Sequence, residues 1–207
     1  MKSDFWEVLK DRRSVRHFTN EAVSDEAVLK ILKAAAIAPS GSNQKNWEFI
    51  VVRDALLKDR LRRIVADRIT EMAATMSSPA AQASFNNYAK YFTFFSSAPV
   101  VIAVVMRPHD SITARILRRY FEAGVFEQYA GVQSVSAAVQ NMLLACTALG
   151  LGACWMTGPL IAKKGLEEAL SVEAPRQLAA LIPVGVPKIT PKPNEFPATV
   201  ENFVRFI

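Results

Sequence analysis

The sequence has few of the residues on which common catalytic centres depend. Its 207 residues include two histidines, His17 and His109, and two cysteines, Cys146 and Cys154. Without a Cys-x-x-Cys pair or a cysteine–histidine cluster, neither a metal site nor a disulfide framework is expected. We interpret the histidines as surface or hydrogen-bonded residues and the cysteines as core residues. No side chain is therefore expected to be the catalytic acid, base or nucleophile, and any chemistry should belong to a cofactor.

A long uncharged stretch lacks the pattern of a membrane span. Residues 128–162 contain no Asp, Glu, Lys or Arg, but polar residues interrupt their first half, and Gly150, Gly152 and Pro159 interrupt their second half. We predict a buried helix over 134–150 followed by a buried strand over 151–156. Asp4 and Glu7 interrupt the N-terminal residues, which do not resemble a signal peptide. These features favour a cytoplasmic protein without a membrane partner.

The basic charge of the chain is divided among separate clusters. The net charge is +6, and the cationic residues gather mainly in 10–16, 58–63 and 115–119. The last two clusters alternate with apolar residues at helical spacing, which is typical of solvated helix faces and not of a nucleic-acid stripe. With 51% hydrophobic residues, the chain is long enough for a sizeable core, and we expect one domain over 1–207.

Hydrophobic periodicity predicts short strands separated by helices, hence an α/β or α+β fold. Asp4 and Ser24 stand at N-cap positions and Gly150 at a C-cap position. Helices are expected at about 4–12, 25–38, 55–76, 85–95, 134–150 and 163–170, and strands at 47–52, 98–106, 151–156 and 178–186. Residues 107–131 are irregular or helical. The proline-rich tail 187–207 should be extended and lie on another surface, such as a partner subunit.

Two stretches have the composition of a ligand site. Residues 11–19, DRRSVRHFT, place Arg12, Arg13 and Arg16 around a serine. Guanidinium groups donate paired hydrogen bonds to a phosphate or carboxylate, although arginines near a helix end can also be merely solvated. Residues 38–49, APSGSNQKNWEF, surround Gly41 with small and polar residues. A flat ligand could approach this backbone, and an ordinary helix-to-strand loop is the alternative.

The order of the segments resembles the nitroreductase family of flavoenzymes. RRSVRHF is followed by a helix, by APSGSNQKNWEFIVV, by SAPVVIAVV, by SAAVQNMLLACTALGLGACWMTG and by LIPVGVP with its tail. The resemblance runs from about residue 8 to residue 197. It implies an α+β fold with a helix-flanked mixed central sheet. It also implies an intertwined homodimer with FMN at the interface, with the tail 187–207 packed on the partner.

The resemblance also implies a set of FMN-binding residues. The basic motif that holds the phosphate and part of the ring is Arg12, Arg13, Ser14 and Arg16. The loop that the second subunit brings to the flavin is Pro39, Ser40, Gly41 and Asn43. The segment that passes the ring is Trp155, Met156, Thr157 and Gly158, and the tail contributes Lys192. The sequence departs from the family pattern at Lys45, where a glutamine is common, and near Glu195, where an arginine is often found.

The activity implied is hydride transfer from NAD(P)H through FMN to an electron-poor acceptor, a nitroaromatic compound or a quinone, in a two-step ping-pong cycle. Aromatic side chains that could stack on the acceptor are Phe85, Tyr88, Tyr91, Phe92, Tyr120 and Phe121. Reductive dehalogenation, enone reduction and flavin fragmentation are alternatives on the same fold. A flavin protein without turnover and a basic protein that binds nucleic acid or another anionic polymer are further alternatives.

Overall fold

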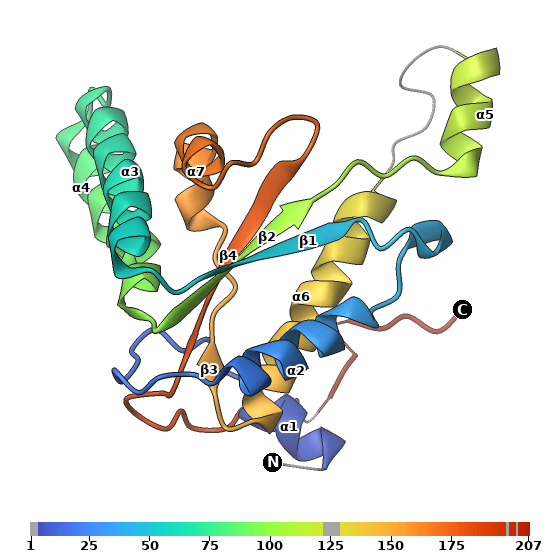
Figure 1. Ribbon diagram of the computed structural model, residues 1–207, viewed down its shortest axis with the longest axis horizontal. Coiled ribbons are helices and arrows are strands. Elements are labelled where there is room, and N and C mark those ends of the chain that lie inside the picture. The colour runs from blue at the N-terminus through green and yellow to red at the C-terminus, as the bar shows by residue number, and fades with distance from the viewer. Residues whose placement is uncertain (1–3, 122–128, 198, 202) are drawn as a thin grey trace.

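A four-stranded antiparallel sheet forms the centre of the structure, which is a computed structural model describing residues 4–121, 129–197, 199–201 and 203–207 (Figure 1). The strand order is β1-β2-β4-β3. The strands are β1 (Trp47–Val52), β2 (Val100–Met106), β3 (Gly152–Ala153) and β4 (Gln177–Gly185). All three neighbouring pairs are antiparallel. A mixed sheet was expected. Within the described residues, the parallel component is one isolated bridge between Ser14 and Ala153.

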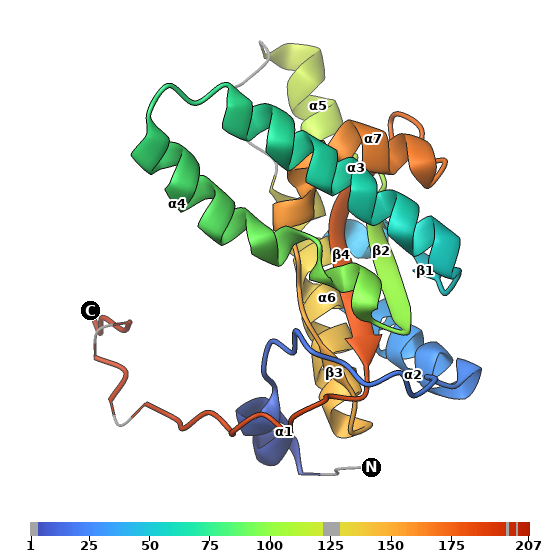
Figure 2. The same ribbon diagram turned by 90° about the vertical axis from the view of Figure 1, so that its left-hand side faces the viewer.

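Two helical layers cover the two faces of the sheet (Figures 1 and 2). One face packs against α2 (Asp25–Ala36) and α6 (Ala130–Ala148). The other face packs against α3 (Ala55–Ala74), α7 (Lys163–Ala169) and the turns around residues 90–97. Because successive side chains of a strand point to opposite faces, Ile102 enters the first core and Val101 and Ala103 the second. Burial on both faces explains why β2 and residues 178–185 of β4 are apolar without interruption.

Helix ends follow the expected capping chemistry. The side chains of Asp4 and Ser24 accept hydrogen bonds from the third backbone N–H beyond them, at the starts of α1 (Phe5–Asp11) and α2. Gly150 follows α6 with a φ of 75°, a left-handed conformation that glycine adopts without steric cost. The predicted caps are confirmed.

Three predicted boundaries are corrected by the structure. Helix α6 begins at Ala130 rather than 134, because Gly131 is accommodated where the backbone packs against His109. The aromatic segment 85–95 is not one helix. Helix α4 (Pro79–Ala89) ends within it, and 3-10 turns at Lys90–Phe92 and Phe94–Ser97 follow. Within 107–131, the described residues include one further helix, α5 (Ile112–Tyr120).

The predicted strand over 151–156 is the third correction, since regular pairing ends at Ala153. The register places Cys154 opposite Pro183 of β4. Proline has no N–H, so the ladder loses a donor at this point. Cys154 N lies 3.4 Å from the Pro183 carbonyl, and pairing resumes only at the bridge between Met156 and Leu181. The segment after β3 is therefore held to β4 at Met156, with a gap in regular pairing before it.

The basic cluster 58–63 lies on α3 as predicted, but Lys58 is not on a solvated face. Its side chain is buried, and Nζ donates to the carbonyl of Ala98 at 2.7 Å. Desolvation lowers the pKa of Lys58 below its ordinary value, and nearby Asp54 opposes the shift. The buried ammonium thus fixes the junction between the 3-10 turns and β2.

The tail from Pro187 is extended, as expected. It passes α1, and its end then runs away from the body of the subunit (Figure 2). Phe196 stacks edge-on against Trp6 with ring centroids 5.8 Å apart. The first part of the tail lies on residues 10–19 of its own chain, through Lys188 N to the His17 carbonyl and Asn194 N to the Lys10 carbonyl, and not on a partner as predicted. Phe203 and Phe206 are 82% and 93% exposed, and packing of this end on a partner subunit stays a prediction. No helix among the described residues combines the length and apolar character needed to cross a bilayer.

Candidate functional site

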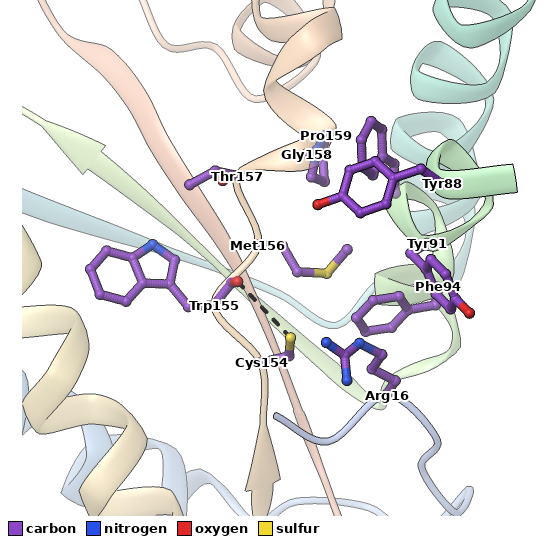
Figure 3. A pocket seen from close by; sticks show the side chains of 11 residues that line it. Arg16, Tyr88, Tyr91, Phe94, Cys154, Trp155, Met156, Thr157, Gly158 and Pro159 are labelled. Atoms are coloured by element: carbon purple, nitrogen blue, oxygen red, sulfur yellow. Dashed lines mark hydrogen bonds between the residues drawn. The ribbon is translucent and has the colours of Figure 1, made fainter. Parts of the chain in front are cut away.

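A cavity of about 410 Å³ lies between the segment 154–158 and the end of α4 (Figure 3). Its lining joins one cation to several aromatic side chains and a stretch of irregular backbone. The lining residues are Arg16, Tyr88, Tyr91, Phe92, Phe94, Cys154, Trp155, Met156, Thr157, Gly158 and Pro159. The cavity thus unites one residue of the predicted phosphate motif, the predicted ring segment and half of the predicted acceptor aromatics.

Side chains alternate along the segment after β3. Cys154 and Met156 point toward Arg16 and the aromatic residues, whereas Trp155 and Thr157 point to the opposite side (Figure 3). Trp155 and Thr157 also line a second, largely apolar cavity of about 250 Å³ beside β4 and α6. Regular pairing is interrupted opposite Pro183, while Met156 stays bonded to Leu181 through its N–H and its carbonyl, so the segment passes the larger cavity as irregular backbone.

Close packing on β3 places Arg16 at the cavity. Val15 is buried, and its N–H donates to the Ala153 carbonyl at 3.0 Å. A Cβ added to Gly152 would lie 2.7 Å from a Val15 methyl group, so only glycine permits this approach. The Arg16 side chain is exposed, with a long contact of 3.4 Å from Nη1 to the Ser14 carbonyl. Its guanidinium therefore keeps most of its donors for an anion.

The other two arginines of the motif are placed differently. The Arg12 carbonyl accepts a hydrogen bond of 3.0 Å from Asn194 Nδ2, and Arg13 Nη1 donates to Asn194 Oδ1. Neither Arg12 nor Arg13 lines the large cavity. Lys192 is exposed on the same tail and does not line it either.

The aromatic wall depends on a glycine. Tyr88 and Phe92 form an edge-to-face pair with centroids 5.4 Å apart. A Cβ on Gly158 would lie 2.4 Å from the Phe92 ring, so this ring packs directly on the glycine backbone. Phe85, by contrast, packs on the core beneath. The remaining predicted aromatics, Tyr120 and Phe121, are exposed at α5, which stands off the body of the subunit, outside this cavity (Figure 1).

The predicted flavin loop lies away from the cavity of its own subunit. Pro39, Ser40, Gly41 and Asn43 precede β1 at its far end, and none of them lines the cavity (Figure 1). Gly41 N donates to Ser134 Oγ at 3.1 Å, and a Cβ on Gly41 would lie 2.7 Å from His109. A loop fixed outward in this way could serve a second subunit, which remains a prediction.

Lys45, the departure from the family loop, and its neighbour Asn46 take part in holding the loop. Arg107 Nη2 donates to the Lys45 carbonyl at 2.7 Å. Asn46, which is buried, donates from Nδ2 to the Gly131 carbonyl at 3.2 Å. Asn46 Oδ1 and both ring nitrogens of His109 are buried and have no hydrogen-bond partner among the residues that the structure describes. The His109 ring thus packs directly against Gly41, whereas the sequence indicated a surface or hydrogen-bonded histidine.

Cys154 is the lining residue that the sequence analysis missed, together with Phe94 and Pro159. Its position two residues before Met156 is the signal that was available, because alternate residues share a face. Desolvation raises the pKa of the Cys154 thiol, against a smaller lowering by Arg16 and Ser14. Full burial raises the pKa of Cys146 to about 12. Among the described residues, no group of His, Cys, Asp or Glu could hold a metal ion.

These pKa shifts predict selective thiol labelling. The thiolate is the reactive form, so alkylation of Cys154 should be slow at neutral pH and rise about tenfold for each pH unit below its raised pKa. Cys146 should stay unlabelled until the chain unfolds. Peptide mass spectrometry after iodoacetamide treatment at several pH values measures both, with Cys154→Ser as the control. Equal labelling of the two cysteines in the native protein would contradict the placement.

Comparison with known proteins gives one consistent answer. Residues 9–186 match the model of the nitroreductase family. A protein of Archaeoglobus fulgidus, provisionally named NADH dehydrogenase/NAD(P)H nitroreductase, is 31% identical over 179 residues, which are 86% of this chain and 82% of that protein. A BluB-like flavoprotein of Clostridium difficile 630 superposes over the whole of both chains with a TM-score of 0.90 and 30% identity.

A second similar structure contains a bound cofactor. Oxidised iodotyrosine deiodinase bound to FMN and 3-iodo-L-tyrosine superposes with a TM-score of 0.70 at 25% identity, over 97% of this chain and 99% of that one. The relatives thus include proteins named for more than one reaction.

Proposed function

This chain belongs to the nitroreductase family, and from that premise we propose that it is an FMN-dependent oxidoreductase which passes hydride from NAD(P)H to an electron-poor acceptor. The observation that carries the proposal is the cavity in which Arg16, the backbone of 154–158 and the aromatic wall meet. Nitroaromatic compounds and quinones are the proposed acceptors. The proposed assembly is a cytoplasmic homodimer that binds neither nucleic acid nor membrane.

The residues of the cavity fit FMN in both charge and shape. Arg16 supplies an exposed guanidinium for a phosphate or for the polar edge of the ring. Gly158 lets the Phe92 ring pack directly on its backbone, which sets the position of the flat aromatic wall against which a ring could stack. Ser14 and Arg16 also line a recess of about 220 Å³ next to the cavity, wide enough for the phosphate end. Charge neutralisation would come from the basic motif, with Lys192 as a further candidate from the tail.

In the proposed mechanism, FMN would supply the hydride chemistry between NAD(P)H and the acceptor when bound beside Arg16 and the aromatic wall. The chain orients the reactants and excludes water. Tyr88, Tyr91 and Phe92 form one aromatic wall on which a nicotinamide and then an acceptor ring could stack. The hydroxyls of the two tyrosines can donate to an acceptor oxygen. Because both ring systems would use the same wall, donor and product must leave before the next molecule enters.

The loop Pro39–Asn43 is proposed to complete the site of the partner subunit. Its distance from its own cavity favours this arrangement, as does the outward course of the tail (Figures 1 and 2). A dimer would also cover the exposed Tyr129 and Val132 at the start of α6.

An anaerobic absorbance experiment tests the proposal. The purified protein, supplied with FMN and freed of excess, should show a flavin spectrum that bleaches on addition of NADH or NADPH. Addition of a nitroarene or a quinone should then restore the colour. A folded protein that fails to bind FMN would contradict the proposal at its first step.

Reductive dehalogenation is the second candidate, and the likeness to a deiodinase bound to 3-iodo-L-tyrosine favours it. The two tyrosines of the wall could hold a halogenated phenol as well as a quinone. Release of iodide from an iodophenol by the reduced protein, with no reoxidation by nitroarenes and quinones, would favour this candidate. Permanent loss of flavin absorbance when the reduced protein meets oxygen would instead indicate flavin fragmentation.

A further inference from the structure

The tail binds along the whole basic motif of its own subunit. We call residues 186–196 the strap. Thr19 N donates to the Val186 carbonyl and Lys188 N to the His17 carbonyl, both at 2.9 Å. At the other end of the motif, Asn194 N donates to the Lys10 carbonyl at 2.7 Å. The strap therefore runs antiparallel to residues 10–19 and is fixed at both ends.

Asn194 is the central contact of the strap. In addition to its backbone bond to Lys10, its Nδ2 donates to the Arg12 carbonyl at 3.0 Å and its Oδ1 accepts from Arg13 Nη1. One half-buried amide side chain thus uses its donor and its acceptor on consecutive arginines. Phe196 continues the contact by packing against Trp6 and under the Lys10 ammonium.

Because of this contact, Arg13 and Arg16 have different positions and different partners. Arg13 is directed to the strap, whereas Arg16 is left exposed at the cavity. The strap also forms the second wall of the recess of about 220 Å³, where Ile189 and Pro191 face Ser14 and Arg16. The anion site is therefore built from two segments far apart in the sequence, and the amide of Asn194 connects them.

We propose that Asn194 is a positioning residue for the FMN phosphate, acting through the main chain of Arg12 and the side chain of Arg13 without touching the cofactor. The inference rests on the proposed function. Cationic groups bind an anion more tightly when they are already ordered, because less conformational entropy is lost on binding. The role of Arg13 is then to hold the strap, not to contact the phosphate.

Asn194→Ala tests this role by comparing two ligands. FMN and riboflavin share the ring and the ribityl chain, but only FMN has the phosphate. Loss of the two side-chain hydrogen bonds should raise the Kd of FMN by about tenfold. The Kd of riboflavin should change by less than about twofold, because the ring site does not depend on Asn194. Quenching of flavin fluorescence by the apoprotein measures both constants.

Two further variants separate positioning from general damage. Asn20→Ala removes the same side chain at an exposed position just beyond the motif and should leave both constants unchanged. Arg13→Ala should weaken FMN in the wild-type background. In the Asn194→Ala background, Arg13→Ala should raise the FMN Kd by less than about a further twofold, because both substitutions remove the same Arg13–Asn194 hydrogen bond. A thermal melt of each apoprotein shows whether the fold survives.

Several outcomes would overturn the inference. They are an unchanged FMN Kd in Asn194→Ala, an equal weakening of FMN and riboflavin, and a further large loss when Arg13→Ala is added. Wild-type protein that binds riboflavin as tightly as FMN would also overturn it. Failure of the wild-type protein to bind either flavin would instead refute the proposed function, so the two failures are distinguishable.

Discussion

Replacing Ser14 and Arg16 together by alanine is expected to give a folded protein that purifies without flavin. Arg16 is the cation at the large cavity, and both residues line the adjoining recess. A hydrogen bond to a charged group contributes about 1.5–3 kcal/mol. Loss of at least two such contacts should raise the FMN Kd by about 100-fold or more.

The stability of the same variant should barely change. Both side chains are exposed, and substitutions at exposed positions usually alter the free energy of unfolding by less than about 0.5 kcal/mol. Urea unfolding of the apoprotein and fluorescence titration with FMN measure the two effects separately. Arg60→Ala, which removes an exposed arginine on α3, is the matched control and should bind FMN normally. Wild-type affinity in the double variant would place the phosphate elsewhere.

Phe95→Ala is expected to produce the largest loss of stability. Phe95 is completely buried in the core that includes Leu61 and Leu166, directly below the aromatic wall. Removing a buried phenyl ring costs about 3–5 kcal/mol, because transfer free energy is lost and a cavity is left. Since Phe94 lines the functional cavity and shares the same 3-10 turn, flavin binding should weaken as well.

Equilibrium unfolding in urea measures the free energy of unfolding for this variant. Leu56→Ala is the control, because Leu56 is 82% exposed at the start of α3. That substitution should cost less than about 0.5 kcal/mol. A Phe95→Ala protein within about 1 kcal/mol of the wild type would show that the turn 94–97 does not pack as the structure has it.

Only part of the candidate site could be predicted from the chain. The arginine motif and the segment Trp155–Gly158 were indicated by residue type and by family order, and both reach one cavity through Arg16 and the backbone beyond β3. Cys154 was missed, because a cysteine among apolar residues has the pattern of a core residue. Cys154 is buried in the core as predicted, and it also borders the cavity, because Arg16 and the aromatic wall come to it from distant segments.

The division of roles among similar residues was likewise decided by tertiary contacts. Arg13 and Arg16 have the same side chain three residues apart, yet Asn194 engages the first and the cavity receives the second. Lys58 belongs to a cationic cluster typical of a solvated helix face. Its side chain is nevertheless buried, and its ammonium donates to the carbonyls of Ala98 and Pro99, just before β2. No local pattern contains this information, because the partner residues come from distant segments.

The sequence by itself determined the local structure and the type of protein. Periodicity and capping residues placed the helices and the buried strands, since these depend on neighbours within a few residues. The order of the motifs indicated the family. Only the tertiary structure decided which side chains face the cavity, where the loop Pro39–Asn43 lies, and that the tail binds the arginine motif of its own subunit. Those features depend on long-range packing and on lost or gained backbone pairing, which no local stretch of the sequence specifies.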